Sequence, residues 1–281
     1  MQLIGAQVAS NHHKRMKYAL TFLLLASLVL GQEPSASSPP SENIPVDQAN
    51  QKKARGVLEQ TIQALGGQAY LTFQDFSQEG RRYSFHHGQP NSLGTLFWRF
   101  QKYPDKDRIE LTKKRDVIEV VNGDKGYEIT YKGVRNWEAK DELDPYMRRR
   151  KFSMDAVLRE WLKDPGVALF YEGQTVAAQK ETDQVTVMNS KNEAVTFYLD
   201  INTHLPVKKT FSWRDPTDKQ RNTEEEIFDN YRSVQNIMTP FDVTRVYNGE
   251  MSAQSFMTTA SYNQGLSDNL FDPQQAAAKK H

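Results

Sequence analysis

The residues best suited to acid–base chemistry are the carboxylates of Glu224, Glu225 and Glu226. Glu224 and Glu226 would share one face of a strand, because strand side chains alternate between two faces. Paired carboxylates on one face are typical of general acid–base catalysis. The nearby Lys219 and Arg221 instead favour a solvated strand of balanced charge. We therefore assign no catalytic residue and expect that the protein is not an enzyme.

The histidines do not indicate a metal site. His86 and His87 are adjacent on the end of a predicted strand, so their side chains would point to opposite faces and cannot hold one ion. His204 and His281 have no partner at a metal-ligand spacing. The sequence also lacks the nucleophile elbow, the zinc-protease motif, the phosphate-binding loop and the dinucleotide-binding loop. We expect no metal and no cofactor.

One concentrated basic run is formed by Arg148, Arg149, Arg150 and Lys151. It is a possible docking patch for anionic lipid headgroups or for an acidic partner surface. A solvated linker is the alternative. Over the whole chain, 36 basic residues balance 35 acidic ones to a net charge of +1, so no overall field attracts nucleic acid.

Most of the chain has the period-two apolar pattern of β-strands, as in the stretch Phe197 to Trp213. We predict eleven to thirteen strands after Thr72, joined mainly by short turns such as Asn122-Gly123 and Asn248-Gly249. This arrangement predicts one large, curved antiparallel sheet. Its recurrent aromatic residues would suit a filled core or the wall of an apolar cavity, and periodicity alone does not separate the two.

Two helical segments interrupt the strand pattern. Apolar residues at helical spacing predict a helix over Gln51 to Leu65, ended by Gly66-Gly67. A second, short helix would begin after the capping residue Ser153. One face of this second helix carries Met154, Val157, Leu158 and Trp161.

The N-terminus has the pattern of a secretory signal. Lys14, Arg15 and Lys17 precede the apolar run Ala19 to Leu30, and small residues stand near Gly31. The run is shorter than the ~20 residues needed to span a bilayer, although an uncleaved anchor is the alternative. Met16 could be the true start of translation. Without any cysteine, the chain offers no site for N-terminal lipidation and no disulfide.

These patterns divide the chain into a signal peptide (residues 1–31), a Pro- and Ser-rich linker (32–47), one mainly β domain (48–273) and a flexible tail (274–281). The linker holds four prolines and no apolar periodicity. We expect a periplasmic monomer, with secretion to the medium as the alternative location.

The order of several short stretches carries a family resemblance. They are GTLFWRFQKYP (Gly94–Pro104), VVNGDKGYEI (Val120–Ile129), FYLDINTHLP (Phe197–Pro206), FDNYRSV (Phe228–Val234), TPFDV (Thr239–Val243) and NLFDP (Asn269–Pro273). In this order they resemble the periplasmic outer-membrane lipoprotein-sorting proteins, the LolA-like family, over roughly residues 48–273. The resemblance implies an unclosed β-barrel whose concave apolar face is covered by helices and accepts acyl chains.

On this resemblance we expect a carrier that binds acyl chains of a lipoprotein or another lipid, with a membrane-bound delivery or acceptor protein as a second partner. The helix bearing Met154, Val157, Leu158 and Trp161 would be its movable lid. The residues expected to line its cavity are Trp98, Phe100, Tyr127, Ile129, Phe197 and Leu199. The alternatives are a lipid- or lipoprotein-sensing regulatory module of the same fold and an enzyme acting on envelope glycans or lipids.

Overall fold

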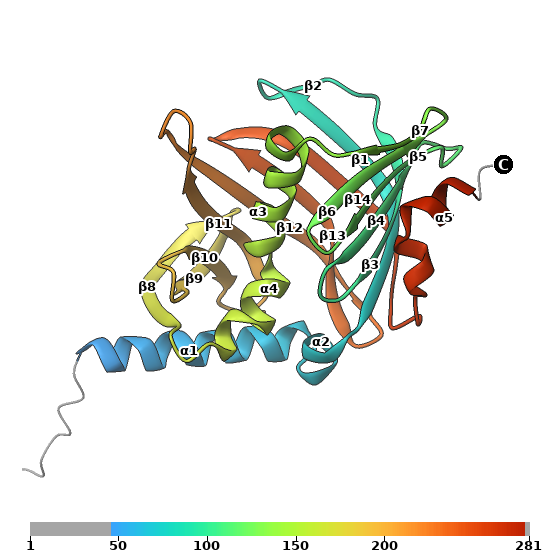
Figure 1. Ribbon diagram of the computed structural model, residues 1–281. Coiled ribbons are helices and arrows are strands. Elements are labelled where there is room, and N and C mark those ends of the chain that lie inside the picture. Colours follow the sequence, from blue (N-terminus) through green and yellow to red (C-terminus); the bar gives the residue numbers. More distant parts are fainter. Residues whose placement is uncertain (1–45, 279–281) are drawn as a thin grey trace, which may run out of the picture. The chain divides into compact units, whose positions relative to one another are not determined.

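The computed structural model describes residues 46–278 (Figure 1). The predicted signal peptide and residues 32–45 of the predicted linker therefore lie outside the described residues. Within residues 46–278, no helix is both long and apolar enough to cross a membrane.

The helical segments are α1 (Val46–Leu65), α2 (Gln68–Thr72), η1 (Ala139–Leu143), α3 (Asp144–Lys151), α4 (Met154–Arg159), η2 (Trp161–Lys163), η3 (Asp268–Phe271) and α5 (Pro273–Ala278). The strands are β1 (Asp75–His86), β2 (Gln89–Pro90), β3 (Thr95–Lys102), β4 (Lys106–Leu111), β5 (Val117–Asn122), β6 (Lys125–Thr130), β7 (Gly133–Asn136), β8 (Ala168–Ala177), β9 (Lys180–Met188), β10 (Ala194–Asp200), β11 (Pro206–Arg214), β12 (Arg221–Val234), β13 (Ile237–Tyr247) and β14 (Glu250–Tyr262).

All fourteen strands belong to one antiparallel sheet in the order β7-β6-β5-β4-β3-β1-β14-β13-β12-β11-β10-β9-β8, with the two-residue β2 paired to β1. The chain first runs outward from β1 to β7, then begins again at β8 and returns strand by strand to β14, which pairs with β1. The ends of the order, β7 and β8, do not pair with each other, so the sheet stays open. The predicted fold class, a large curved antiparallel sheet with few helices, is confirmed.

Local sequence signals explain several boundaries. Asn248 and Gly249 take φ values of 49° and 85° and join β13 to β14 in the predicted tight turn. Pro206 is the first residue of β11, where its missing N–H does least harm. Helix α1 ends at Gly66, where a Cβ atom would lie only 2.4 Å from the carbonyl oxygen of Asn236. The hydroxyl of Ser153 accepts a hydrogen bond from the N–H of Ala156 and caps α4.

Two helices differ from the sequence-based expectation. The basic run Arg148–Lys151 lies just before α4, but it forms the end of helix α3, which the sequence pattern did not predict. Residues 274–278, expected in a flexible tail, belong to α5, and Ala276 is buried against the sheet. The segment QQAAA contains no large apolar residue, so its packing on small side chains leaves no periodic signal in the sequence.

The sheet bends around α3 and α4, and α5 lies on its other face (Figure 1). The neighbouring residues Asp107 and Arg108 of β4 show which helices cover each face of the sheet. Asp107 accepts a hydrogen bond from Tyr146 of α3, whereas Arg108 donates to the carbonyl oxygen of Leu270 in η3. Since adjacent strand residues point to opposite faces, α3 covers the concave face, and η3 and α5 cover the convex face.

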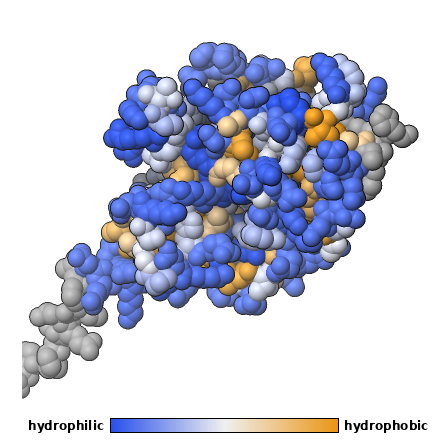
Figure 2. Space-filling view, viewed as in Figure 1, coloured by the Kyte–Doolittle hydropathy of each residue, from blue (hydrophilic) through white to orange (hydrophobic). Residues whose placement is uncertain are grey.

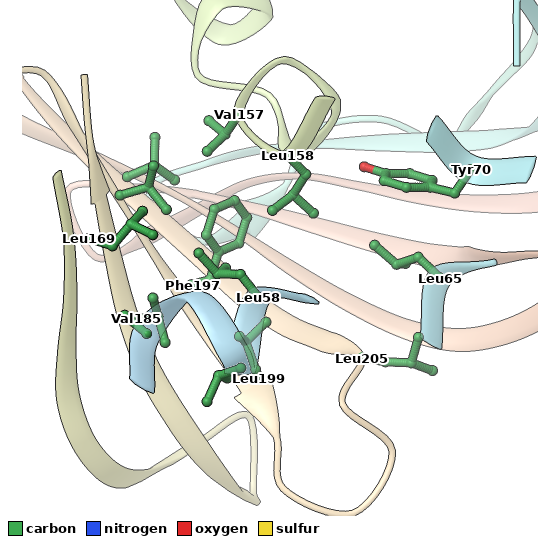
Figure 3. Close-up of a cluster of buried hydrophobic side chains, with 14 of the residues drawn as sticks. Leu58, Leu65, Tyr70, Val157, Leu158, Leu169, Val185, Phe197, Leu199 and Leu205 are labelled. Carbon is green, nitrogen blue, oxygen red and sulfur yellow. The ribbon is translucent and has the colours of Figure 1, made fainter. Parts of the chain in front are cut away.

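Each face has its own apolar cluster. On the concave face, α1 and α4 cover β8 to β11, and Leu58 and Leu158 pack against Phe197 and Leu199 (Figure 3). On the convex face, Phe271 of η3 and Ala276 of α5 pack against β5 and β6. The larger concave cluster is the main core.

The edge strand β8 is covered by one side chain. Asn50 of α1 donates from its amide to the carbonyl oxygen of Tyr171 at 2.8 Å and accepts from the N–H of Tyr171 at 2.9 Å. A neighbouring strand would make the same two bonds, so the amide satisfies backbone groups that an open sheet leaves unpaired.

We expect Phe197→Ala to lower the free energy of unfolding by about 3–5 kcal/mol, because Phe197 is fully buried among side chains of three elements. Urea unfolding followed by circular dichroism would measure it. The matched control is Tyr198→Ala, one residue along β10 and half-buried on the other face. Equal losses for the two variants would contradict a main core on the concave face.

Candidate functional site

A cleft of about 830 Å³ lies between the helical segments η1 and α3 and the strands β11 to β14. Its volume is within the range of about 300–1,000 Å³ that is usual for ligand pockets. Its lining includes apolar groups and charged groups of both signs. The lining residues used below are Arg82, Arg148, Arg149, Phe211, Trp213, Glu224, Glu225, Glu226, Arg245 and Tyr247.

Strand register explains why these residues meet. Phe211 of β11 pairs with Glu224 of β12, which pairs with Tyr247 of β13. The next row on the same face, two residues away on each strand, joins Lys209, Glu226 and Arg245. The period of two therefore turns three ordinary strand sequences into two transverse rows facing α3.

The second row is a buried ion-pair group. The ammonium of Lys209 is 3.1 Å from Glu226 and donates to the carbonyl oxygen of Phe152 at 2.8 Å. Arg245 lies 3.1 Å from the other oxygen of Glu226. Burial acts to raise the pKa of Glu226, but the charges of Lys209 and Arg245 outweigh it and hold that pKa at about 2. A raised pKa, as a general acid requires, is thus opposite to what this site produces.

Helix α3 is fixed over the concave face by aromatic and charged contacts. Tyr146 donates to Asp107, which also receives a two-pronged hydrogen bond from Arg99. Arg148 lies 3.2 Å from Glu224, and its guanidinium is 3.4 Å from the ring centre of Trp213. Helix α3 therefore contacts β4 in one half of the sheet and β11 and β12 in the other half.

The four residues of the predicted docking patch lie in different environments. Arg148 faces the cleft, Arg150 donates to the carbonyl oxygen of Gly123 at 2.8 Å, and Lys151 pairs with Glu193. Arg149 lines the cleft. The four side chains do not form one exposed surface, and their role in docking stays a prediction.

The predicted lid residues lie together on and beside α4. Val157 and Leu158 are fully buried, and Met154 and Trp161 pack against the same concave cluster. Val157 and Leu158 belong to the same cluster as Phe197 (Figure 3). In this conformation the apolar end of the concave face is filled by the protein's own side chains.

The predicted cavity residues divide between the two faces. Phe197 and Leu199 lie on the concave face beneath α1 and α4. By strand register Trp98, Phe100, Tyr127 and Ile129 lie on the convex face, on the side of η3 and α5. The indole N–H of Trp98, for example, donates to Glu79. The structure therefore does not bring the six into one cavity, and a ligand-binding role for them stays a prediction.

Sequence reasoning missed Lys209 and Arg159. Lys209 interrupts the apolar face formed by Val207, Phe211 and Trp213, and that single charge in an apolar alternation was the available signal. Arg159 of α4 is only 4% exposed and donates to the carbonyl oxygens of Leu71 and Phe73. Its position at the end of a short helix gave no sign of burial.

The face that carries α3 is mainly hydrophilic, with small, scattered hydrophobic areas (Figure 2). The carboxylates of the cleft's β12 rim are all ion-paired: Glu224 with Arg148, Glu225 with Lys208, and Glu226 with Lys209 and Arg245. Among residues 46–278, no group of three or more acidic or histidine side chains is placed to hold a metal ion. The arrangement is suited to binding an amphipathic molecule.

One open antiparallel sheet wrapped around short helices defines the class, and the fold is LolA-like. The chain is similar to a DUF1329 family protein from Desulfovibrio piger, with a TM-score of 0.56 and 13% identity over 79% of this chain and 98% of that one. It is also similar to a proposed outer membrane lipoprotein-sorting protein domain from Vibrio parahaemolyticus, with a TM-score of 0.54 and 11% identity over 80% and 98%. At these identities the likeness concerns the fold. No family model and no curated protein matches the sequence.

We expect Glu226→Gln to lower the free energy of unfolding at pH 7 by about 3–5 kcal/mol, because Lys209, 1% exposed, would lose its carboxylate. The matched control is Glu225→Gln, whose partly exposed pair with Lys208 should contribute about 0–1 kcal/mol.

The same pair of variants gives a pH test. The pKa of Glu226 is about 2 in the folded protein, below the ordinary value of 4.5. The ion pairs therefore stabilise the fold above about pH 4.5, and this stabilisation is lost as the pH falls towards 2. Urea unfolding at pH 7 and pH 3 should show the gap between wild type and Glu226→Gln narrowing. A constant gap would contradict the assignment.

Proposed function

We propose that this protein is an exported carrier, without catalytic activity, that binds acyl chains of a lipoprotein or another lipid and moves them across the periplasm. The observation that supports it best is an open sheet with a cleft on its concave face beside a core covered by a short helix. The resemblance in fold to a proposed lipoprotein-sorting domain supports the same proposal. The signal-like N-terminus supports export.

Two places on the concave face can receive hydrocarbon. The first is the open cleft, where Phe211, Trp213 and Tyr247 offer aromatic surface. The second is the cluster around Phe197, which becomes accessible only when α4 moves away. Burial of a chain of ~16 carbons is worth at most roughly 12 kcal/mol before ordering costs, at about 0.8 kcal/mol per methylene. That gain is large enough to offset the displacement of a six-residue helix.

Besides its apolar packing on the concave cluster, α4 is held by a small set of polar contacts. Arg159 donates to the carbonyl oxygens of Leu71 and Phe73 at 3.2 and 2.8 Å, and its guanidinium is 3.6 Å from the ring centre of Tyr103. Tyr70 donates to Asp155 at 2.9 Å. One guanidinium nitrogen of Arg159 is buried without a hydrogen-bond partner, so the closed state leaves one donor group unsatisfied. We assign Arg159 as the residue that closes the lid.

Lipid should accompany the mature chain when it is exported to a bacterial periplasm and purified without detergent. Native mass spectrometry should show an added mass, and organic extraction should identify an acylated molecule. The protein after extraction should bind a fluorescent fatty acid. A clean apo mass together with no binding of the fluorescent fatty acid would contradict the proposal.

Movement of α4 can be measured with spin labels, because the chain has no native cysteine. Glu160→Cys, at the residue that follows α4, and Gln60→Cys on α1 provide exposed positions. Addition of oleic acid should shift or broaden the distance distribution between these labels. The control pair, Gln60→Cys with Glu181→Cys on β9, should keep its distance. An unchanged α4 distance despite bound oleic acid would restrict the acyl site to the open cleft.

A further inference from the structure

Two arginines in the cleft have no hydrogen-bonded or ion-paired carboxylate. Arg82 of β1 and Arg149 of α3 both line the cleft, yet within residues 46–278 neither side chain makes a hydrogen bond or an ion pair. The remaining arginines of the lining are neutralised, since Arg148 pairs with Glu224 and Arg245 pairs with Glu226. The cleft therefore holds two guanidinium groups whose hydrogen-bond donors the protein itself leaves unused, although its lining also carries Asp141, Asp144 and Asp215.

The sheet and the helix bring these two arginines together from distant parts of the sequence. On β1, Arg82 pairs with Ser255 of β14, next to the row that ends at Arg245. Arg149 enters the same cleft from α3 on the opposite wall. Two guanidinium groups on facing walls can donate several hydrogen bonds to one tetrahedral or planar anion.

The surroundings of Arg82 and Arg149 disfavour the charged form of both guanidinium groups. Burial and the nearby charges of Arg245 and Arg149 lower the pKa of Arg82 to about 10, while Glu119 partly offsets the effect. Burial likewise lowers the pKa of Arg149, with Arg245 adding to the effect and Glu224 and Glu226 partly offsetting it. These carboxylates do not hydrogen-bond to Arg82 or Arg149, and an anion bound to both guanidinium groups would relieve their mutual repulsion.

The floor of the cleft points to the rest of the ligand. Trp213 lines the cleft beside Phe211, and its indole N–H is buried without a hydrogen-bond partner. Buried indole groups usually find an acceptor. An acyl ester has both an apolar chain for the ring and a carbonyl oxygen for this donor.

We propose that Arg82 and Arg149 bind the anionic phosphate headgroup of an acylated lipid whose chain lies against Phe211 and Trp213. This inference rests on the proposed carrier function and deepens it by naming the class of ligand. The same chemistry would also hold a free phosphate ester, so the test separates a lipid headgroup from a soluble anion.

The test uses three probes on the mature protein after removal of bound lipid: 1-acylglycerol 3-phosphate, the monoacylglycerol of the same chain length, and glycerol 3-phosphate. Isothermal titration calorimetry measures each dissociation constant. The test variant is Arg82→Gln with Arg149→Gln. The charge-matched control is Arg55→Gln with Lys114→Gln, two exposed positions outside the cleft.

The wild type should bind 1-acylglycerol 3-phosphate at least tenfold more tightly than the monoacylglycerol and far more tightly than glycerol 3-phosphate. The test variant should lose about tenfold or more in affinity for the acylated phosphate and keep its affinity for the monoacylglycerol. The control should match the wild type. Urea midpoints of all variants report folding, and Arg82→Gln alone remains as a milder variant, because this side chain lies within the cleft but keeps access to solvent.

Three results would overturn the proposal, and they differ in meaning. Equal binding of both acylated probes, unaffected by the arginine changes, would reject the headgroup site and leave the carrier function standing. Glycerol 3-phosphate binding as tightly as the acylated phosphate would assign the arginines to a soluble anion. Binding of no acylated probe would reject the carrier function as well.

Discussion

The end of helix α3 is held over the sheet by one buried charge, that of Lys209. Its ammonium is 1% exposed and bridges Glu226 of β12 to the carbonyl oxygen at the end of α3. An ion removed from water in this way is tolerated only when its partners are fixed in place. The group therefore ties the register of β11, β12 and β13 to the position of α3. It also marks the boundary between the apolar cluster and the cleft.

The two halves of the concave face are therefore stabilised by different interactions. Towards β8 the face is filled, and its stability comes from apolar area removed from water. Towards the centre of the sheet it is open and lined by charges, most of which are balanced in pairs. A guest with an apolar tail and a charged head would find a suitable environment in each half, with the short helix α4 at the border.

Strand alternation and turn signals were enough to predict one large curved antiparallel sheet with short turns, and apolar residues at helical spacing predicted α1 and α4. That the sheet is open came from the family resemblance. It was harder to predict which residues lie on the concave face of the sheet and which on the convex face. Period two shows that Trp98 and Phe100 share a face, but it does not say which face is concave. That choice depends on η3 and α5, and the alanines of α5 look like a tail in the sequence.

The charged cleft could not be predicted from the sequence either, for a related reason. Glu224 and Glu226 have the pattern of a solvated strand, and only the register with β11 and β13 shows that they face Phe211, Lys209 and Arg245. Arg82 and Arg149 are more than sixty residues apart in a sequence of 281. No local pattern could have placed them on facing walls of one cleft.

The amide of Asn50 has a consequence for how the protein behaves in a crowded compartment. An open sheet that does not close on itself could grow indefinitely by adding strands from other molecules. The side chain of Asn50 from α1 forms hydrogen bonds with the backbone N–H and carbonyl oxygen of Tyr171 in β8. A strand from another molecule cannot pair with β8 at this residue. The opposite margin is the four-residue β7, which is too short to nucleate a stack. The two margins of the open sheet thus differ, one with its backbone occupied at Tyr171 and the other only four residues long.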